Sequence, residues 1–293
     1  MSYIKMQVFD LGGTWIRAAN ISNEGKFGSI IKEPTEEDFI GQIKKISGQL
    51  TLSTEERNHL DYIVVATPGP VRDGMLLSAP PLGLKNSLDL KKELASLVTG
   101  KSTEIIVEND LNAAVLAELH EGYGKQWNNF YLLTLSTGIG AGIVLNGKSV
   151  KGGEFGHSPI NPLEYPDQRC SCGRTNCWSA YASGKGIESL IKKIYPKYET
   201  IEEVCKAYKK EEAARTIINI ANNANAQGLA MMINALEVEG IVIMGSLGLH
   251  QYNLLIPSNI EIEEYAINSI PEIVKTKLGD TIGLLGAYYR AIS

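Results

Sequence analysis

Cysteine, long apolar runs and excess charge of either sign are all scarce in this sequence. Four cysteines in 293 residues are too few for a secreted fold stapled by disulfides. No apolar run approaches the roughly 18 residues of a membrane span, and the N-terminal MSYIKMQVFD lacks the basic segment and apolar stretch of an export signal. We therefore expect a cytoplasmic protein that does not contact a membrane.

The charge and composition are those of an ordinary globular protein. A net charge of -5 and a pI near 5.5 argue against a surface built for nucleic acid. Apolar residues make up 44% of the chain and charged residues 21%, and 293 residues are enough for two domains. The chain can therefore build real hydrophobic cores.

Strand and helix signals alternate along the first half of the chain. Strands over 3–10 and 15–22, on either side of a Gly-rich turn, and a third short strand predict an antiparallel meander. Thr35 is expected to begin a helix, with its hydroxyl as the N-cap. The other predicted elements are a strand over 61–67, a helical segment over 87–98, a strand over 104–109 and a helix over 110–121. This alternation favours an α/β sheet.

The second half begins as the first does. A strand over 130–136 leads into a Gly-rich turn at 137–140 and a second strand, so a strand-turn-strand unit heads each half. The elements expected after the cysteine cluster are a helix over about 211–237, a strand over 240–246, a strand near 272 and a last helix from about 280.

The stretch GIVLNGKS, residues 142–149, matches the P-loop pattern G-x-x-x-x-G-K-[ST]. A P-loop needs a tight loop that opens a helix. Here two β-branched residues and a leucine follow Gly142 and favour a strand, and Asn146-Gly147 favours a hairpin turn. We interpret the stretch as a strand that enters a hairpin, and the match as chance.

Two Gly-rich turns are better candidates for phosphate loops. In DLGGT, residues 10–14, exposed backbone amides and the Thr14 hydroxyl can face a phosphate while Asp10 faces its Mg²⁺. STGIGAG, residues 136–142, offers a second set of amides and hydroxyls. Either turn alone could be a plain hairpin. Two of them, each opening one half of the chain, suggest a clamp.

Three of the four cysteines lie within the eight residues CSCGRTNC, 170–177. Their C-x-C-x₄-C spacing indicates a metal site, and the alternative is free thiols in a turn.

Taken together, these motifs resemble the ROK sugar kinases, which belong to the actin-like, hexokinase-like ATPases. The segments that carry the resemblance are DLGGT, ATPGPV, ENDLNAA, STGIGAG, GGEFGH, CSCGRTNC and LGDTIGLLGAYYRA. The resemblance implies a two-domain α/β protein of the actin-like (ribonuclease H-like) ATPase fold, with a cleft between the domains. The smaller N-terminal domain would comprise 1–112 and about 281–293, and the larger domain, with a zinc-binding loop, 113–280.

The catalytic pair of this family matches Asn109 and Asp110. The resemblance implies that both lie against the sugar and that Asp110 takes the proton from the attacking hydroxyl. A general base is needed because an alcohol is a poor nucleophile. From spacing alone, a helix N-cap is the preferred interpretation of Asp110, and the surrounding motifs reverse that preference.

The resemblance also implies the remaining ligand sites. Glu154 and His157 match residues that hold sugar hydroxyls. Zinc would be bound by His157, Cys170, Cys172 and Cys177. The second ring nitrogen of His157 would then face the sugar in a fixed tautomer. The residues expected to hold ATP and Mg²⁺ are Asp10, Gly12, Gly13, Thr14, Ser136, Thr137, Gly138, Gly140 and Gly245.

Three positions depart from the glucose-using members of the family. Ser179 stands where those members have Glu, Pro81 where they have Asn, and Lys85 where they have Trp. Loss of the Glu removes a strong acceptor for the 2-hydroxyl and leaves room for an N-acetyl group at C2, unless Trp178 fills that space. A further departure, MGS at 244–246 in place of a Gly-richer adenosine loop, bears little on ATP.

We therefore expect an ATP- and Mg²⁺-dependent kinase that phosphorylates the 6-hydroxyl of an N-acetylhexosamine, above all N-acetylmannosamine. The alternatives are a glucokinase or broad-specificity hexokinase, and a sugar-binding sensor without catalysis. A ROK repressor would need a DNA-binding domain before DLGGT, which begins at residue 10. A chaperone-type or filament ATPase would need neither ENDLN nor the cysteine cluster. We also expect a homodimer or a higher homo-oligomer.

Overall fold

The computed structural model describes residues 5–22, 24–50, 60–98, 103–161, 165 and 167–293. The chain divides into two compact units, unit 1 being Met1–Gly122 with Leu278–Ser293 and unit 2 being Tyr123–Lys277. The first division follows Gly122, whereas the sequence predicts it after residue 112. The reason is that helix α4 (Asp110–Glu121) packs along its length against the C-terminal helix α12 (Ile282–Ile292) and so belongs to unit 1.

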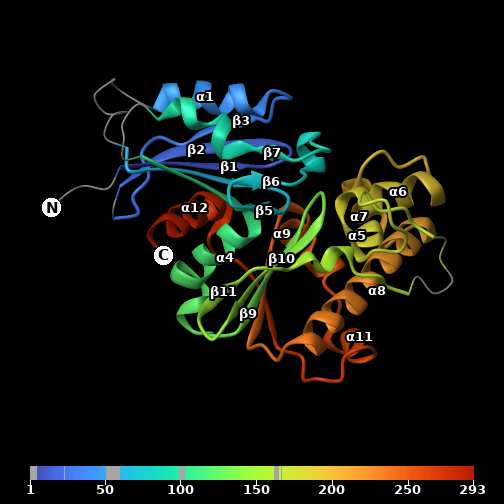
Figure 1. The fold of residues 1–293 in the computed structure, drawn as a ribbon. Helices are drawn as coiled ribbons and strands as arrows, with labels where there is room; N and C mark the ends of the chain where they lie inside the picture. Colours follow the sequence, from blue (N-terminus) through green and yellow to red (C-terminus); the bar gives the residue numbers. More distant parts are fainter. Residues whose placement is uncertain (1–4, 23, 51–59, 99–102, 162–164, 166) are drawn as a thin grey trace. The chain divides into compact units, whose positions relative to one another are not determined.

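Unit 1 is built on a five-stranded sheet of order β3-β2-β1-β4-β8 (Figure 1). The strands are β1 Lys5–Leu11, β2 Trp15–Ser22, β3 Ile31–Pro34, β4 Tyr62–Thr67 and β8 Glu104–Asn109. The first three form the predicted antiparallel meander, and β4 and β8 pair in parallel beside β1. Residues 3 and 4 of the predicted first strand lie outside the described part of the chain.

Helices cover both faces of this sheet. Helix α1 (Phe39–Leu50) lies on one face, and α4 and α12 lie on the other (Figure 1). Alternate residues of β1 explain the two layers, since Phe9 packs in the core on the α1 side and Val8 in the core on the α12 side. Both side chains are fully buried. The carboxyl ends of β4 and β8 are thereby fixed at one edge of the sheet.

Two predictions about unit 1 were wrong. The first helix begins at Phe39 rather than Thr35, because the Thr35 hydroxyl donates to the Gly12 carbonyl and Asp38 instead accepts from the Gly41 amide. The segment 87–98 is not one helix, because Leu88–Asp89 at its start pairs as a strand with Met75–Leu76. The smaller elements are β5 Val71–Arg72, β6 Met75–Leu76, η1 Pro80–Leu82, β7 Leu88–Asp89, α3 Leu90–Glu93, η2 Ala95–Leu97 and η5 Gly279–Thr281.

Unit 2 has a second five-stranded sheet, of order β11-β10-β9-β12-β13. The strands are β9 Phe130–Leu135, β10 Ile139–Leu145, β11 Lys148–Val150, β12 Gly240–Met244 and β13 Glu272–Lys275. The stretch GIVLNGKS is the end of β10, a turn and the start of β11, as predicted. Asn146 and Gly147 both have positive φ, 51° and 69°, which is typical of a tight hairpin turn.

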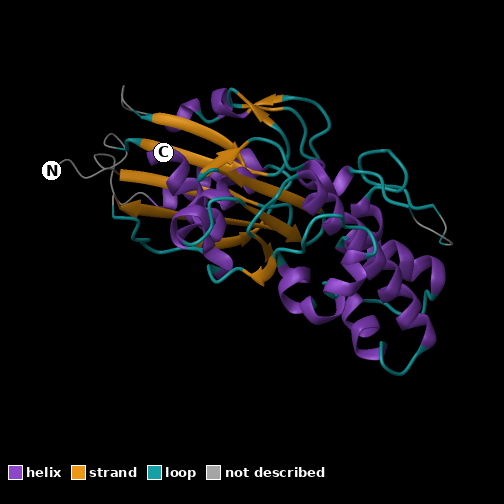
Figure 2. Cartoon of the chain, turned by 90° about the horizontal axis from the view of Figure 1, so that it is seen from below, coloured by secondary structure: helices purple, strands orange, loops and turns teal. Residues whose placement is uncertain are grey.

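Most of the rest of unit 2 is helical, and its helices gather beside the sheet (Figure 2). They are η3 Tyr123–Lys125, η4 Glu154–His157, α5 Trp178–Ala182, α6 Gly184–Ile194, α7 Ile201–Ala207, α8 Glu212–Ala235, α9 Ser246–His250, α10 Tyr252–Leu255 and α11 Asn259–Glu263. The long helix α8 packs against α5, α6 and α7, and its buried residues belong to the hydrophobic core of unit 2. Among the described residues, we find no helix both long and apolar enough to span a bilayer.

Candidate active site

The DLGGT turn joins β1 to β2 and is held from two sides. The Gly12 amide donates to the Trp15 carbonyl at 2.9 Å, and the Thr35 amide and hydroxyl donate to the turn's own carbonyls. A Cβ on Gly13 would lie 2.6 Å from the Pro81 Cβ, so only glycine permits this approach of η1. Gly13 and Thr14 remain exposed. Their backbone and hydroxyl groups are therefore open to a phosphate.

The carboxyl group of Asp10, near the end of β1, is mostly buried and lies beside a charged side chain. Arg17 Nη1 lies 3.4 Å from its Oδ2, and the Asp10 side chain is only 17% exposed. Burial raises the pKa of the Asp10 carboxyl to about 6, and the neighbouring Asp280 adds to the rise while Arg17 opposes it. A divalent cation would lower that pKa again, because it favours the ionised carboxylate. This acidic group beside an open phosphate turn fits Mg²⁺.

The pair Asn109 and Asp110 lies at the junction of β8 and α4. Asn109 is the N-cap of α4, and its Oδ1 accepts from the Leu111 and Asn112 amides, both at 3.0 Å. The N-cap interpretation of Asp110 is therefore wrong, because the preceding residue fills that place. Asp110 is the first helical residue, half-buried, at the positive end of the helix dipole.

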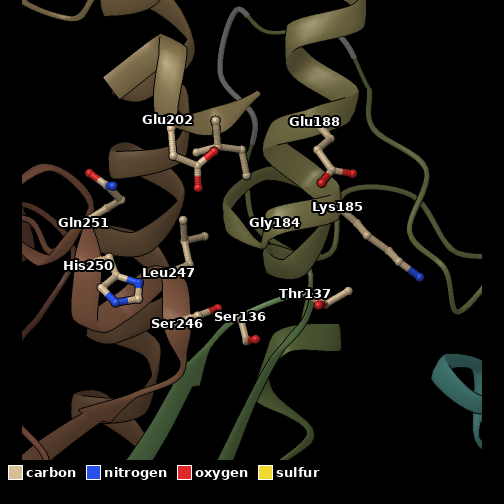
Figure 3. A pocket seen from close by; sticks show the side chains of 11 residues that line it. Ser136, Thr137, Gly184, Lys185, Glu188, Glu202, Ser246, Leu247, His250 and Gln251 are labelled. Carbon is tan, nitrogen blue, oxygen red and sulfur yellow. The ribbon is translucent and has the colours of Figure 1, made fainter. Parts of the chain in front are cut away.

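The second Gly-rich turn borders a cavity within unit 2 (Figure 3). The amides at the start of α6 hold the turn, since Gly184 N donates to the Ser136 carbonyl and Lys185 N to the Thr137 carbonyl. The cavity is lined by Ser136, Thr137, Gly184, Lys185, Glu188, Ile201, Glu202, Ser246, Leu247, His250 and Gln251. Ser136 and Thr137 lie at one end of it in Figure 3, and Glu188 and Glu202 at the other. The cavity is thus polar and continuous with a predicted phosphate loop.

Most of this lining was not visible in the sequence. The residues from α6 and α7 carry no motif, and Ser246 at the start of α9 is the one lining residue outside the turn that belongs to a segment singled out above, 244–246. The others are found only because they line one cavity with Ser136 and Thr137. Gly245 precedes the lining residue Ser246 and has φ 86°, with the Leu135 carbonyl 2.5 Å from where a Cβ would be. Glycine is therefore required there for the close approach of β12 to β9. Gly140, in contrast, is buried inside β10 opposite Thr134.

The predicted metal ligands converge on one point of unit 2. The ligand atoms of His157, Cys170, Cys172 and Cys177 all lie within 4.8 Å of one another. His157 Nδ1 is 3.4 Å from Cys170 Sγ, and the sulfurs of Cys172 and Cys177 are 3.6 Å apart. A tetrahedral zinc with Zn–S bonds of about 2.3 Å would separate sulfurs by about 3.8 Å. The donor set and its spacing therefore fit a structural zinc ion.

The other ring nitrogen of His157 faces away from the sulfurs. His157 Nε2 lies 4.0 Å from Glu154 Oε2, and both residues belong to the short helix η4. The Glu154 side chain is 67% exposed. The two predicted sugar ligands of unit 2 are thus neighbours, with one nitrogen of the imidazole turned to the cysteines and the other to the Glu154 carboxylate.

Trp178 and Ser179, which follow the last cysteine of the cluster, have different surroundings. Trp178 is completely buried, its Nε1 donates to Asn225 Oδ1 at 2.8 Å, and Gly228 lies directly under its ring. Ser179 is 8% exposed. The Ser179 carbonyl accepts from the Ser183 hydroxyl at 2.6 Å, and the same hydroxyl oxygen caps α6 by accepting from the Gly186 amide at 3.1 Å. Trp178 is therefore a core residue that packs against α8.

The predicted site residues are accordingly divided between the two units. Those of unit 1 are Asp10, Gly12, Gly13, Thr14, Asn109 and Asp110, and those of unit 2 are Ser136, Thr137, Gly138, Gly140, Glu154, His157, Gly245 and the three cysteines. Within unit 1, Asn109 Nδ2 donates to the Gly69 carbonyl at 3.1 Å, which ties the start of α4 to the ATPGPV segment.

Known proteins resemble this chain over both units. The profile of the ROK family matches residues 7–293. An N-acetylmannosamine kinase from Haemophilus influenzae is 30% identical over 286 residues, covering 96% of this chain and 93% of that protein. A glucokinase from Thermotoga maritima is 28% identical over 317 residues, covering 98% of this chain and 97% of that protein. The crystal structure of a ROK hexokinase from Thermus thermophilus matches with a TM-score of 0.79 at 25% identity, over 99% of each chain.

Proposed function

The chain belongs to the ROK family and has the actin-like ATPase fold, and from that premise we propose that it is a sugar kinase. Its reaction is the transfer of the γ-phosphate of ATP to the 6-hydroxyl of an N-acetylhexosamine, N-acetylmannosamine above all. Relatives named N-acetylmannosamine kinase at 30% identity support this choice. A relative named glucokinase, at 28%, supports the second candidate, phosphorylation of glucose.

Asp110 is the proposed general base. Its carboxylate accepts the proton of the sugar 6-hydroxyl while the hydroxyl oxygen forms a bond to the γ-phosphorus. The bond from the γ-phosphorus to its bridging oxygen breaks, and the electron pair leaves with ADP. The position of Asp110 supports this role, because it is the half-buried first residue of α4, directly after the N-cap Asn109. Its Oδ1 accepts from the Leu111 amide at 2.9 Å, which holds the carboxylate at the start of the helix.

The remaining residues bind and orient the reactants. Thr14 with the amides of the DLGGT turn, and Ser136 with Thr137, are proposed to hold the phosphates, with Asp10 as the acidic group for Mg²⁺. Bound Mg²⁺ would neutralise charge on the transferring phosphates. Asn109, Glu154 and His157 are proposed to bind sugar hydroxyls. Zinc, held by His157 and the three cysteines, would order the loop that presents Glu154.

The observation that carries the choice of sugar is the placement of Trp178. Its indole is fully buried and hydrogen bonded to Asn225, which supports the proposal that the side of Ser179 toward the sugar is left to the substrate. A site without the carboxylate at this position loses an acceptor for the 2-hydroxyl of glucose and gains room for an acetamido group. We therefore rank N-acetylmannosamine above glucose.

A panel of sugars assayed with ATP and Mg²⁺ tests the proposal. We expect the highest kcat/KM for N-acetylmannosamine, ahead of N-acetylglucosamine, mannose and glucose. If glucose is the best substrate, the specificity is wrong and the protein is a glucokinase. If sugars bind but no ADP forms, the protein is a sugar-binding sensor.

We further propose a cytoplasmic location, where ATP is available, and a homodimer or higher homo-oligomer, which sedimentation of the purified protein can test.

A further inference from the structure

The last helix of the chain contacts the strand end that carries the catalytic pair. Arg290 of α12 donates from Nε to Glu108 Oε2 at 2.8 Å, across 182 positions of sequence. Glu108 directly precedes Asn109 and Asp110. We propose that Arg290 and Glu108 are positioning residues for the catalytic turn. This role rests on the proposed function of Asp110 as general base.

Glu108 joins α12 to the turn by using both of its oxygens. While Oε2 accepts from Arg290, Oε1 accepts from the Asn109 amide at 3.0 Å and from Asn112 Nδ2 at 3.3 Å. The Asn109 side chain then caps α4 and donates to the Gly69 carbonyl. One carboxylate therefore fixes the backbone immediately before the general base.

The arginine is what allows this carboxylate to stay in place. The Glu108 side chain is only 8% exposed, and the Arg290 side chain is 38% exposed. A buried carboxylate that loses its cationic partner is strongly unfavourable, so it turns toward water. This movement weakens its bond to the Asn109 amide. Since a displacement on the order of 1 Å can lower a rate about 100-fold, catalysis should be sensitive to Arg290.

The contact between α12 and α4 contains a matched control. Tyr289, next to Arg290, stacks on His120 with ring centroids 4.3 Å apart and donates its hydroxyl to Glu121. His120 and Glu121 lie at the C-terminal end of α4, whereas the catalytic turn lies at its N-terminal end. Loss of the Tyr289 hydroxyl therefore weakens the packing of the same two helices without touching Glu108.

The test compares Arg290→Met, Arg290→Lys and Tyr289→Phe in full-length protein, by steady-state kinetics with N-acetylmannosamine and ATP and by Tm. For Arg290→Met we expect kcat to fall by about 10-fold to 100-fold with the KM for ATP unchanged within about twofold. Arg290→Lys restores the charge and should recover a large part of kcat. Tyr289→Phe should lower Tm and leave kcat within about twofold of the wild type.

Two results would overturn the proposal. One is a wild-type kcat in Arg290→Met with the same loss of Tm as in Tyr289→Phe, which would make the pair a purely structural contact. If Arg290→Met does not fold, Glu108→Gln takes its place, and an unchanged kcat in that variant has the same meaning. The other is a wild-type protein that phosphorylates no sugar. That result needs no variant, so failure of the proposed function is recognised separately.

Discussion

The indole Nε1 of Trp178 and the side-chain Oδ1 of Asn225 form a 2.8 Å hydrogen bond between two completely buried side chains. Asn225 also donates from Nδ2 to the Leu255 carbonyl at 2.7 Å, so it links α5 to the end of α10 through α8. A buried polar chain with both ends satisfied fixes the ring rigidly. Trp178 is consequently a core residue, and its neighbour Ser179 is the position to test for sugar specificity.

Ser179→Glu should move specificity toward glucose. The new carboxylate supplies an acceptor for the 2-hydroxyl and takes space from an acetamido group, so the ratio of kcat/KM for N-acetylmannosamine to that for glucose should fall by about 10-fold or more. Ser179→Ala, which adds no acceptor, is the control and should leave the ratio nearly unchanged. An unaltered ratio in Ser179→Glu would remove this position from the specificity argument.

Asp110→Asn should lower kcat by about 10²-fold to 10⁴-fold, the usual contribution of a general base. The fold should be retained, because Asn109 caps α4 and the substituted amide keeps an oxygen that can accept from the Leu111 amide, as the Asp110 carboxylate does at 2.9 Å. The control is Asn109→Ala, which removes the cap and should cost about 1 kcal/mol of the free energy of unfolding. Near-normal turnover in Asp110→Asn would contradict the assignment of the base.

Purified protein should contain about one zinc per chain, bound by three thiolates and one imidazole. Cys172→Ser should lose most of this zinc, lower Tm and raise the KM for the sugar, because His157 and Glu154 share the short helix η4. Cys205→Ser changes a cysteine outside the cluster, which packs against the core, and should leave the zinc content and the KM for the sugar unchanged. Metal analysis and thermal melts provide the measurements. Zinc-free protein with normal activity would contradict the zinc site and show that the cysteines lie in an ordinary turn.

Asp10 should make the protein less stable at neutral pH than in weak acid. Burial raises the pKa of its carboxyl from 3.8 to about 6, so the folded state binds this proton more tightly than the unfolded state does. The ionised carboxylate therefore costs stability above pH 6, by about 3 kcal/mol at most. The cost shrinks as pH falls through 6 and disappears below about 4.

The measurement is the free energy of unfolding without Mg²⁺ or nucleotide, for the wild type and for Asp10→Asn. At pH 7.5 the free energy of unfolding of Asp10→Asn should be higher than that of the wild type. Loss of the ionised partner of Arg17 makes this gain smaller. The difference should decline between pH 7 and pH 4. Asp38→Asn, at the exposed start of α1, is the control. A difference that does not change with pH would show that the pKa of Asp10 is not raised.

Lys148→Ala should change kcat/KM by less than about threefold, because Lys148 begins β11 after a hairpin turn and does not open a helix. A lysine of a true P-loop lies on the β- and γ-phosphates, and its loss is severe. Ser149→Ala should behave in the same way. A loss of about 100-fold or more in Lys148→Ala would mean that GIVLNGKS binds nucleotide after all.

The sequence by itself determined the features that depend on near neighbours in the chain. The Asn146-Gly147 hairpin follows from the tolerance of these residues for positive φ, and the helix over 110–121 follows from its run of Ala and Leu. The spacing of the cysteines predicted the cluster that the structure assembles with His157. Local conformational preference and short-range spacing were sufficient for these predictions.

Only the tertiary structure decided contacts between segments far apart in sequence. Thr35 has the residue type of an N-cap, yet its hydroxyl bonds to Gly12, 23 residues earlier, because β3 pairs beside the DLGGT turn. The sequence leaves open whether Trp178 faces the sugar. In the structure it faces the core, because α5 packs on α8. The ion pair of Glu108 with Arg290 depends on α12 returning to the sheet. Such contacts are set by which faces are buried together, and no local pattern in the sequence encodes that choice.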